Sequence, residues 1–91
     1  MPIYNIIESF VIDIMDSVLK TKPDVCSCEK CRDDIAALAL NKLKPRYVAS
    51  RMGDLFSRTE LLESKLRTAI IVSIAEAAET VAMNPRHERD V

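Results

Sequence analysis

Apolar residues recur at helical spacing over the first twenty positions. Glycine, which disfavours helix interiors because its backbone has the most conformational freedom to lose, occurs only once in 91 residues. A stripe of this width predicts a helix over residues 3–20 with one face in a core. Lys22 and Pro23 end it, since proline disfavours the α region for the preceding residue. The stripe consists of Ile3, Ile6, Ile7, Phe10, Val11, Ile14, Met15 and Val18.

Two further helices follow from the same periodicity. One begins near Cys28 or Glu29 and runs to about Lys42, with Ile35, Leu38 and Ala39 facing inward. Residues 44–57 read as a loop that contains the only glycine, Gly53. Ser57 and Glu60 have the form of a capping box, which predicts a last helix over about 58–84, closed by Asn84 and Pro85. The prediction is a single all-α domain, residues 1–91, with three main helices.

The size of the chain favours a second subunit. A 91-residue domain buries only roughly 60–65% of its unfolded surface, so a metal or a partner chain is expected to help. The last predicted helix would be about 40 Å long, and its segment 69–78 is apolar on more than one face. A homodimer with these helices around a two-fold axis satisfies both observations. A monomer whose first two helices flank the third is the alternative.

Charge and composition exclude several classes of protein. Thirteen basic and fourteen acidic side chains leave a net charge of -1, which argues against nucleic-acid binding driven by bulk charge. No apolar run approaches the roughly 18 residues of a membrane span, and the N-terminus lacks the basic region of a secretory signal. We therefore expect a soluble cytoplasmic protein with no membrane partner.

The three cysteines lie within six residues, as Cys26, Cys28 and Cys31. Three thiolates this close can converge on one Zn²⁺ ion, whereas an odd, clustered set does not suit a secreted disulfide framework. A structural zinc site needs four ligands, and His87, the only histidine, is the first candidate for the fourth. Asp24, Glu29, Asp33 or a water are the others. Three ordinary thiols near a helix start are the alternative.

Basic residues gather in one segment. Residues 41–58 hold five basic side chains and one acidic one, Lys42, Lys44, Arg46, Arg51 and Arg58 against Asp54, with Asn41 and Tyr47 among them. Guanidinium groups bind phosphate oxygens, a tyrosine ring stacks on a base, and an asparagine amide reads a base edge. This segment predicts either a site for a nucleotide-like anion or a solvated loop that balances acidic helices.

Catalytic patterns are missing. The sequence has no Ser/His/Asp or Cys/His arrangement with an orienting third group and no glycine-rich phosphate loop. The carboxylate pairs Glu60 with Glu63 and Asp33 with Asp34 are typical of surface charge. We expect a binding or adaptor module rather than an enzyme.

One stretch carries a family resemblance. Residues 23–41 read PDVCSCEKCRDDIAALALN, and Leu43, Pro45, Arg46, Tyr47 and Val48 follow. This pattern closely resembles the late competence development protein ComFB family, and the likeness continues through Glu60-Leu61-Leu62 to Asn84-Pro85-Arg86-His87. The sequence departs from the family's commoner Pro-Pro-Arg-Tyr by placing Lys44 before Pro45.

The resemblance implies a small all-helical homodimer stapled by zinc at the cysteines, and a non-enzymatic receptor for cyclic di-GMP or cyclic di-AMP that acts through a partner protein. For such a ligand we assign Arg32 and Arg46 to phosphate, Asp33 and Asn41 to the guanine edge, and Tyr47 to stacking. The alternative is a zinc-stabilised adaptor of the competence or motility machinery, with no nucleotide ligand. Direct DNA binding ranks last, because five basic residues are a weak footprint.

Overall fold

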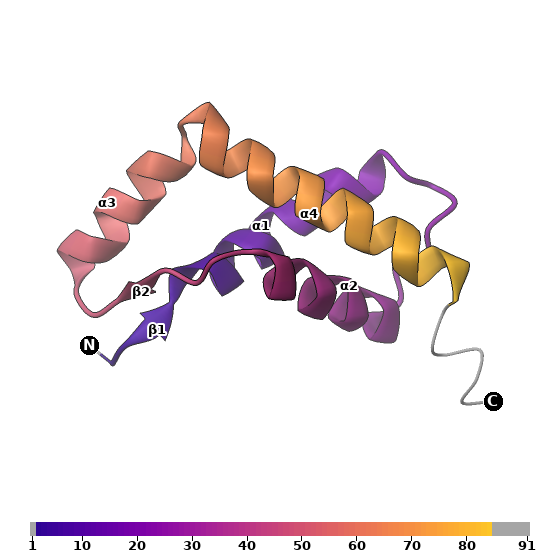
Figure 1. Cartoon of the computed structure of the whole chain (residues 1–91), viewed down its shortest axis with the longest axis horizontal. Helices are drawn as coiled ribbons and strands as arrows, with labels where there is room; N and C mark the ends of the chain where they lie inside the picture. The colour runs from indigo at the N-terminus through magenta and orange to yellow at the C-terminus, as the bar shows by residue number, and fades with distance from the viewer. Residues whose placement is uncertain (1, 85–91) are drawn as a thin grey trace.

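The computed structural model describes residues 2–84, which form four helices and one short two-stranded ribbon (Figure 1). In chain order these are β1 (Tyr4–Asn5), α1 (Ile6–Lys20), α2 (Glu29–Lys42), β2 (Tyr47–Val48), α3 (Arg51–Leu61) and α4 (Ser64–Met83). The molecule is elongated, with extents of 45 × 27 × 18 Å. The prediction of an all-α domain is confirmed in part: the described residues are mostly helical, but they form four helices instead of three and also a two-stranded ribbon.

Helix α1 is the predicted N-terminal helix, shortened at its start. Asn5 caps it, because its side-chain oxygen accepts a hydrogen bond of 3.1 Å from the backbone N–H of Ile7. Residues 4 and 5 are therefore extended, and they pair antiparallel with β2, Tyr4 opposite Val48 and Asn5 opposite Tyr47. The ribbon joins the start of α1 to the segment that follows α2.

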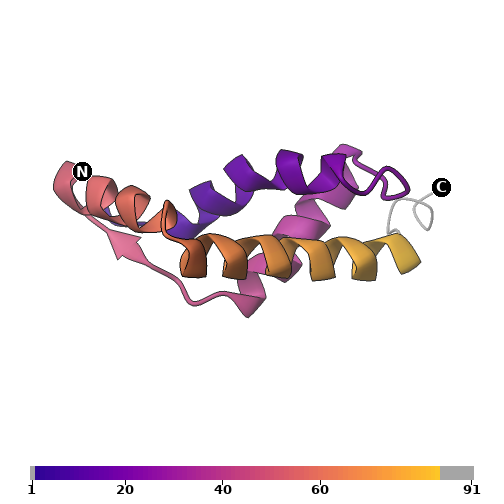
Figure 2. The same cartoon turned by 90° about the horizontal axis from the view of Figure 1, so that it is seen from above.

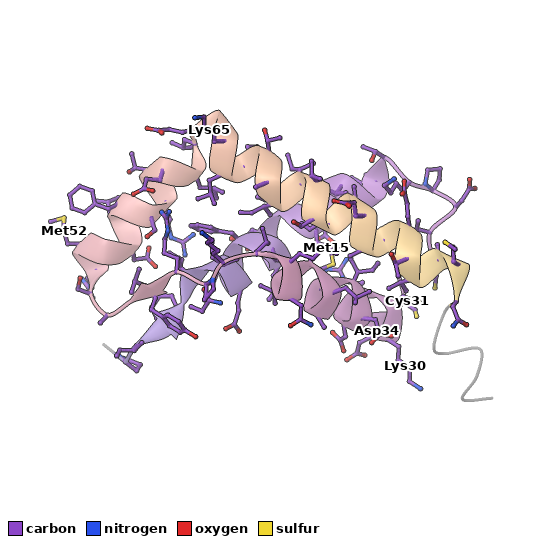
Figure 3. All side chains as sticks on the ribbon, in the orientation of Figure 1. Met15, Lys30, Cys31, Asp34, Met52 and Lys65 are labelled. Atoms are coloured by element: carbon purple, nitrogen blue, oxygen red, sulfur yellow. The ribbon has the colours of Figure 1, made fainter. Side chains whose placement is uncertain are left out.

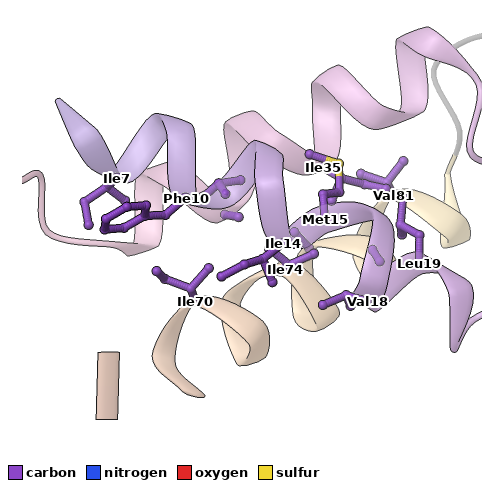
Figure 4. Close-up of a cluster of buried hydrophobic side chains, with 14 of the residues drawn as sticks. Ile7, Phe10, Ile14, Met15, Val18, Leu19, Ile35, Ile70, Ile74 and Val81 are labelled. Carbon is purple, nitrogen blue, oxygen red and sulfur yellow. The ribbon is translucent and has the colours of Figure 1, made fainter. Parts of the chain in front are cut away.

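The core lies between α1, α2 and α4 (Figure 4). Its largest buried side chains, Phe10 and Ile6 from α1, Ile35 from α2, and Ile70 and Ile74 from α4, are at most 2% exposed. The small side chains of Ala39 on α2 and of Ala77 and Ala78 on α4 are fully buried, so these two helices can approach closely. The predicted inward positions Ile35 and Ala39 are confirmed.

Helix α3 corrects the prediction of a loop over residues 44–57. Residues 51–61 are helical, and Ser50 caps the helix, because its hydroxyl accepts a 3.0 Å hydrogen bond from the N–H of Gly53. Ser57 is a buried position inside this helix and does not begin a new one. Both views place α3 at one end of the molecule, beside the ribbon (Figure 2).

The predicted last helix over 58–84 is two helices. A turn at Leu62 and Glu63 separates α3 from α4, and α4 spans 20 residues, which is about 30 Å. Because α4 is about 30 Å long and not about 40 Å, the length argument for a homodimer along this helix no longer holds. Its outward side keeps Val72 and Glu76 exposed within the single chain, so the predicted cover of segment 69–78 by a second subunit stays a prediction. No helix in residues 2–84 is long and apolar enough to cross a membrane.

Candidate functional site

The three cysteines meet at the N-terminal end of α2 (Figure 3, where Cys31 is labelled). Cys28 is the N-cap residue of the helix, Cys31 lies in its first turn, and Cys26 comes from the preceding loop. The three Sγ atoms all lie within 4.8 Å of one another. The helix macrodipole places partial positive charge at this end, which favours thiolates there.

This arrangement fits a soft divalent cation. Three sulfurs bound at about 2.3 Å in a tetrahedral set lie roughly 3.8 Å apart, a spacing that the cluster reaches with small side-chain movements. The three cysteines can therefore hold a metal ion. Among the described residues no carboxylate joins the group, neither Asp24, Glu29 nor Asp33. His87, the predicted fourth ligand, lies outside the described residues.

Burial distinguishes the three thiols. Cys31 is 1% exposed, whereas Cys26 is half-buried and Cys28 is exposed. The pKa of the Cys31 thiol is raised to about 12, mainly by burial and further by hydrogen bonds with Cys28 and Cys26. A cation that binds here must displace the Cys31 proton, so binding is expected to release protons and to weaken at low pH.

A second candidate site lies at the other end of α2. A cavity of about 470 Å³ opens where the loop after α2 passes the first turns of α1 and α4. Three cationic side chains line it, those of Lys42, Lys44 and Arg46. The rest of its lining is apolar, Ile7, Leu43, Pro45, Leu66 and Ala69. This basic cavity combines cations with an apolar wall, the composition that suits an anion with a flat aromatic or apolar part.

The backbone of Arg46 is firmly held. Its N–H donates a 2.8 Å hydrogen bond to the side-chain oxygen of Asn5, and its carbonyl accepts one of 2.8 Å from Ile6. Its guanidinium forms an ion pair of 2.6 Å with Glu60 of α3, and both side chains are partly exposed. An incoming anion would compete with Glu60 for Arg46, while Lys42 and Lys44 have no ion-pair partner among residues 2–84.

The other predicted ligand residues are not all brought together. Arg32 lines a separate cavity of about 370 Å³ and is paired with Asp16. Asp33 is exposed in the first half of α2, and Asn41 is exposed eight residues later, about 12 Å along the helix axis. Tyr47 is 66% exposed in β2, beside the loop that lines the basic cavity.

The assignment of ligand residues missed much of the basic cavity. Lys42 and Lys44 belong to the basic segment recognised in the sequence, and their charge was the available signal. The residues of the apolar wall had no such signal in the sequence, because Ile7 and Leu66 reach the cavity only through the packing of α1 and α4. The ligand residues that were assigned from the sequence stay predictions.

A thin helical core with a thiol cluster at one end of α2 and a basic cavity at the other defines a small helical domain with a candidate metal centre. Comparison of the sequence with protein families is decisive for its kinship. The profile described as late competence development protein ComFB matches residues 4–85. The chain belongs to the ComFB family.

Two relatives agree with this membership. The chain is 32% identical over 73 residues to the competence protein ComFB of Bacillus subtilis (strain 168), an alignment that covers 80% of this chain and 74% of that protein. A solved structure, titled as the structural characterization of the late competence protein ComFB from Bacillus subtilis, superimposes with a TM-score of 0.79 and 30% identity. It covers 92% of this chain and 94% of the other.

Proposed function

We propose that this protein is a non-enzymatic cytoplasmic receptor for a cyclic dinucleotide, cyclic di-GMP or cyclic di-AMP, and that it acts through a partner protein. The observation that carries the proposal is the basic cavity, where Lys42, Lys44 and Arg46 face an apolar wall. A cyclic dinucleotide offers the matching chemistry, two phosphates and two purines. The resemblance described above supports the same ligand class.

Each part of the ligand has a chemical counterpart at the cavity. The three cations neutralise phosphate charge, and Arg46 can bind two phosphate oxygens at once. The ring of Tyr47 and the amide of Asn41 flank the same loop and supply stacking and base-edge hydrogen bonds. Arg32 and Asp33 lie toward the other end of α2, so the proposed site does not depend on them.

The proposal includes two structural elements. The cysteine cluster holds a structural Zn²⁺ through Cys26, Cys28 and Cys31, with His87 as the fourth ligand, and so fixes the start of α2. The chain forms a homodimer, which suits a ligand that is itself two-fold symmetric, because each subunit presents the same groups to one half. Neither element supplies a catalytic group.

Isothermal titration of the zinc-loaded protein with cyclic di-GMP and with cyclic di-AMP tests the proposal, with GTP as the control for non-specific anion binding. We expect saturable binding of one ligand per two chains for a cyclic dinucleotide and none for GTP. Arg46→Ala should weaken binding at least about tenfold, the loss of one charged hydrogen bond.

Three matched variants sharpen this titration. Lys65→Ala removes an exposed cation outside the cavity and Arg32→Ala removes one of the three cations that line the other cavity, so both should bind as the parent does. Glu60→Gln removes the carboxylate that competes for Arg46 and should bind at least as tightly as the parent. No saturable heat for either cyclic dinucleotide would contradict the proposal and leave the zinc-stabilised adaptor of the competence or motility machinery.

A further inference from the structure

Two of the three cysteines form a Cys-x-x-Cys pair at the start of a helix. Cys28 is the N-cap residue of α2 and Cys31 lies in its first turn, with Glu29 and Lys30 between them. The backbone N–H of Arg32 donates a 2.9 Å hydrogen bond to the carbonyl of Cys28, so the first helical turn is closed at Cys28. Two Cα atoms three residues apart on a helical turn are about 5 Å from each other, a separation that a disulfide can bridge.

The sulfur atoms of this pair are close enough to react. All three Sγ atoms of the cluster lie within 4.8 Å of one another, and all three cysteines are reduced. An S–S bond is about 2.0 Å long, so rotations of the two side chains bring the sulfurs of Cys28 and Cys31 together. The turn of α2 already holds the two backbones at the required separation, and the helix does not have to move.

Exposure separates the roles of the two thiols. Cys28 is exposed, whereas Cys31 is 1% exposed. A small oxidant from solution therefore meets the sulfur of Cys28 first. The partial positive charge at the N-terminus of α2 favours the thiolate of Cys28, which is the form that attacks an oxidant. An accessible thiol of this kind beside a second thiol that can resolve it is typical of redox-sensing cysteines.

We infer that Cys28 and Cys31 are a redox-active pair that hydrogen peroxide converts to a disulfide, and that this conversion releases the bound metal. The Cys28 thiolate attacks one peroxide oxygen, the O–O bond breaks, and a sulfenic acid forms while hydroxide leaves. The Cys31 sulfur then attacks the Cys28 sulfur, the S–O bond breaks, and the S–S bond forms while a second hydroxide leaves. The two thiol protons convert both hydroxides to water. In the metal-loaded protein the thiols have already given up these protons, and solvent supplies them.

The disulfide removes two of the three sulfur ligands. A thiolate binds a metal ion but a disulfide sulfur carries no charge to do so, and Cys26 alone is too few ligands for a zinc site. The inference goes beyond the receptor function and rests on the proposed zinc centre only for the release of the ion. Neither Cys28 nor Cys31 lines the basic cavity, so oxidation and dinucleotide binding are measured independently.

Peptide mapping of the zinc-loaded protein after treatment with hydrogen peroxide in slight molar excess tests the inference. Trypsin cleaves after Lys30, which separates the peptide that holds Cys26 and Cys28 from the peptide that holds Cys31. We expect these two peptides to stay joined, with Cys28 linked to Cys31 and Cys26 open to alkylation. A zinc-sensitive dye should report loss of the bound ion over the same time course. Dithiothreitol should separate the peptides and restore zinc binding.

Three variants assign the roles of the thiols. Cys31→Ser removes the resolving thiol, so the sulfenic acid of Cys28 should persist, react with dimedone and give no joined peptides. Cys26→Ser should still form the disulfide. Ser27→Ala keeps all three cysteines and is the matched control, which should behave as the parent does. If a cysteine variant unfolds, fragmentation of the joined peptides of the parent still identifies the linked residue.

Three results would overturn the pair. They are a disulfide between Cys26 and Cys28, oxidation of Cys28 to a sulfinic acid with no joined peptides, and a protein that keeps its zinc and all three thiols in a large excess of peroxide. A Cys28–Cys31 disulfide that forms without loss of zinc overturns the release of the metal. The cyclic dinucleotide titration is decided separately from each of these results.

Discussion

At the scale of single residues, one small network joins three segments of the chain. Tyr4 of β1 donates to Asp54 of α3, which also accepts a 2.6 Å hydrogen bond from Arg58. The pKa of Asp54 is lowered, mainly by the hydrogen bond from Tyr4 and to a smaller extent by Arg58. The same hydrogen bond, together with partial burial, raises the pKa of Tyr4. The contact is strongest with Asp54 ionised and Tyr4 neutral.

This network predicts a defined pH window of stabilisation. Because the pKa of Asp54 is lower in the folded protein than in the unfolded chain, where an aspartate titrates near pH 4, its ionised carboxylate stabilises the fold above about pH 4. This stabilisation is lost as the pH falls through the pKa of the folded state. Because the pKa of Tyr4 is higher in the folded protein than in the unfolded chain, its neutral hydroxyl stabilises the fold below about pH 10. This stabilisation is lost as the pH rises through the pKa of the folded state. The melting-temperature difference between the parent and Tyr4→Phe should therefore be largest between about pH 5 and pH 9 and shrink outside it.

Thermal melts followed by circular dichroism from pH 2 to pH 11 measure this difference. Tyr47→Phe is the matched control, because Tyr47 is exposed and lies in the partner strand of the same ribbon. A Tyr4→Phe difference that stays constant across the range would contradict the role given to Asp54.

The metal ligands make a second prediction at this scale. Cys28→Ser should lower the zinc content well below one ion per chain and reduce the melting temperature by about 5 °C or more, because metal binding and folding are coupled. Ser27→Ala, between two cysteines, is the matched control and should keep its zinc. Elemental analysis and thermal melts provide the two readings, and His87→Ala tests the fourth ligand. A Cys28→Ser protein with full zinc and unchanged stability would exclude the centre.

At the scale of elements, the helices that carry the core were predictable and the one outside it was not. The apolar residues of α1 and of the inward face of α2 recur at the helical period. The predicted ends of these two helices agree with the structure within a few residues. Residues 51–57 were assigned to a loop because they contain the only glycine, Gly53, and directly precede the capping-box pattern of Ser57 and Glu60. The turn at Leu62 and Glu63 contains neither proline nor glycine, so no local signal separates α3 from α4.

The cap of α3 makes that helix testable. Gly53 has no left-handed backbone angle, and an added Cβ would lie 3.4 Å from the Ser50 hydroxyl and 3.6 Å from Val48. Gly53→Ala should therefore raise the free energy of unfolding by up to about 1 kcal/mol through helix propensity. Ser50→Ala should lower it by about 1 kcal/mol through loss of the cap.

Urea unfolding of the two variants measures both changes. Ser9→Ala, on α1 away from any cap, serves as the reference substitution. If Gly53→Ala destabilises the protein and Ser50→Ala has no effect, the segment behaves as the loop that its sequence suggested.

At the scale of the whole molecule, the two candidate sites differ in how far sequence could define them. The thiol cluster is local, since its three ligands lie within six residues, so spacing alone located it. The basic cavity depends on tertiary packing, since α1 and α4 add apolar walls to the loop after α2. Only the cations of that loop could be recognised in the sequence. The sequence could not show that the fold separates Arg32 from Arg46, because Arg32 lines another cavity and pairs with Asp16.

The location of the ligand is the central claim, and amide chemical shifts mapped by NMR on the isotope-labelled, zinc-loaded protein test it most directly. On addition of cyclic di-GMP or cyclic di-AMP we expect the largest shifts at residues 42–47, with a second group at Leu66 and Ala69 on the cavity wall. Shifts concentrated instead around Asp16, Lys20 and Arg32 would place the ligand in the other cavity and contradict the account.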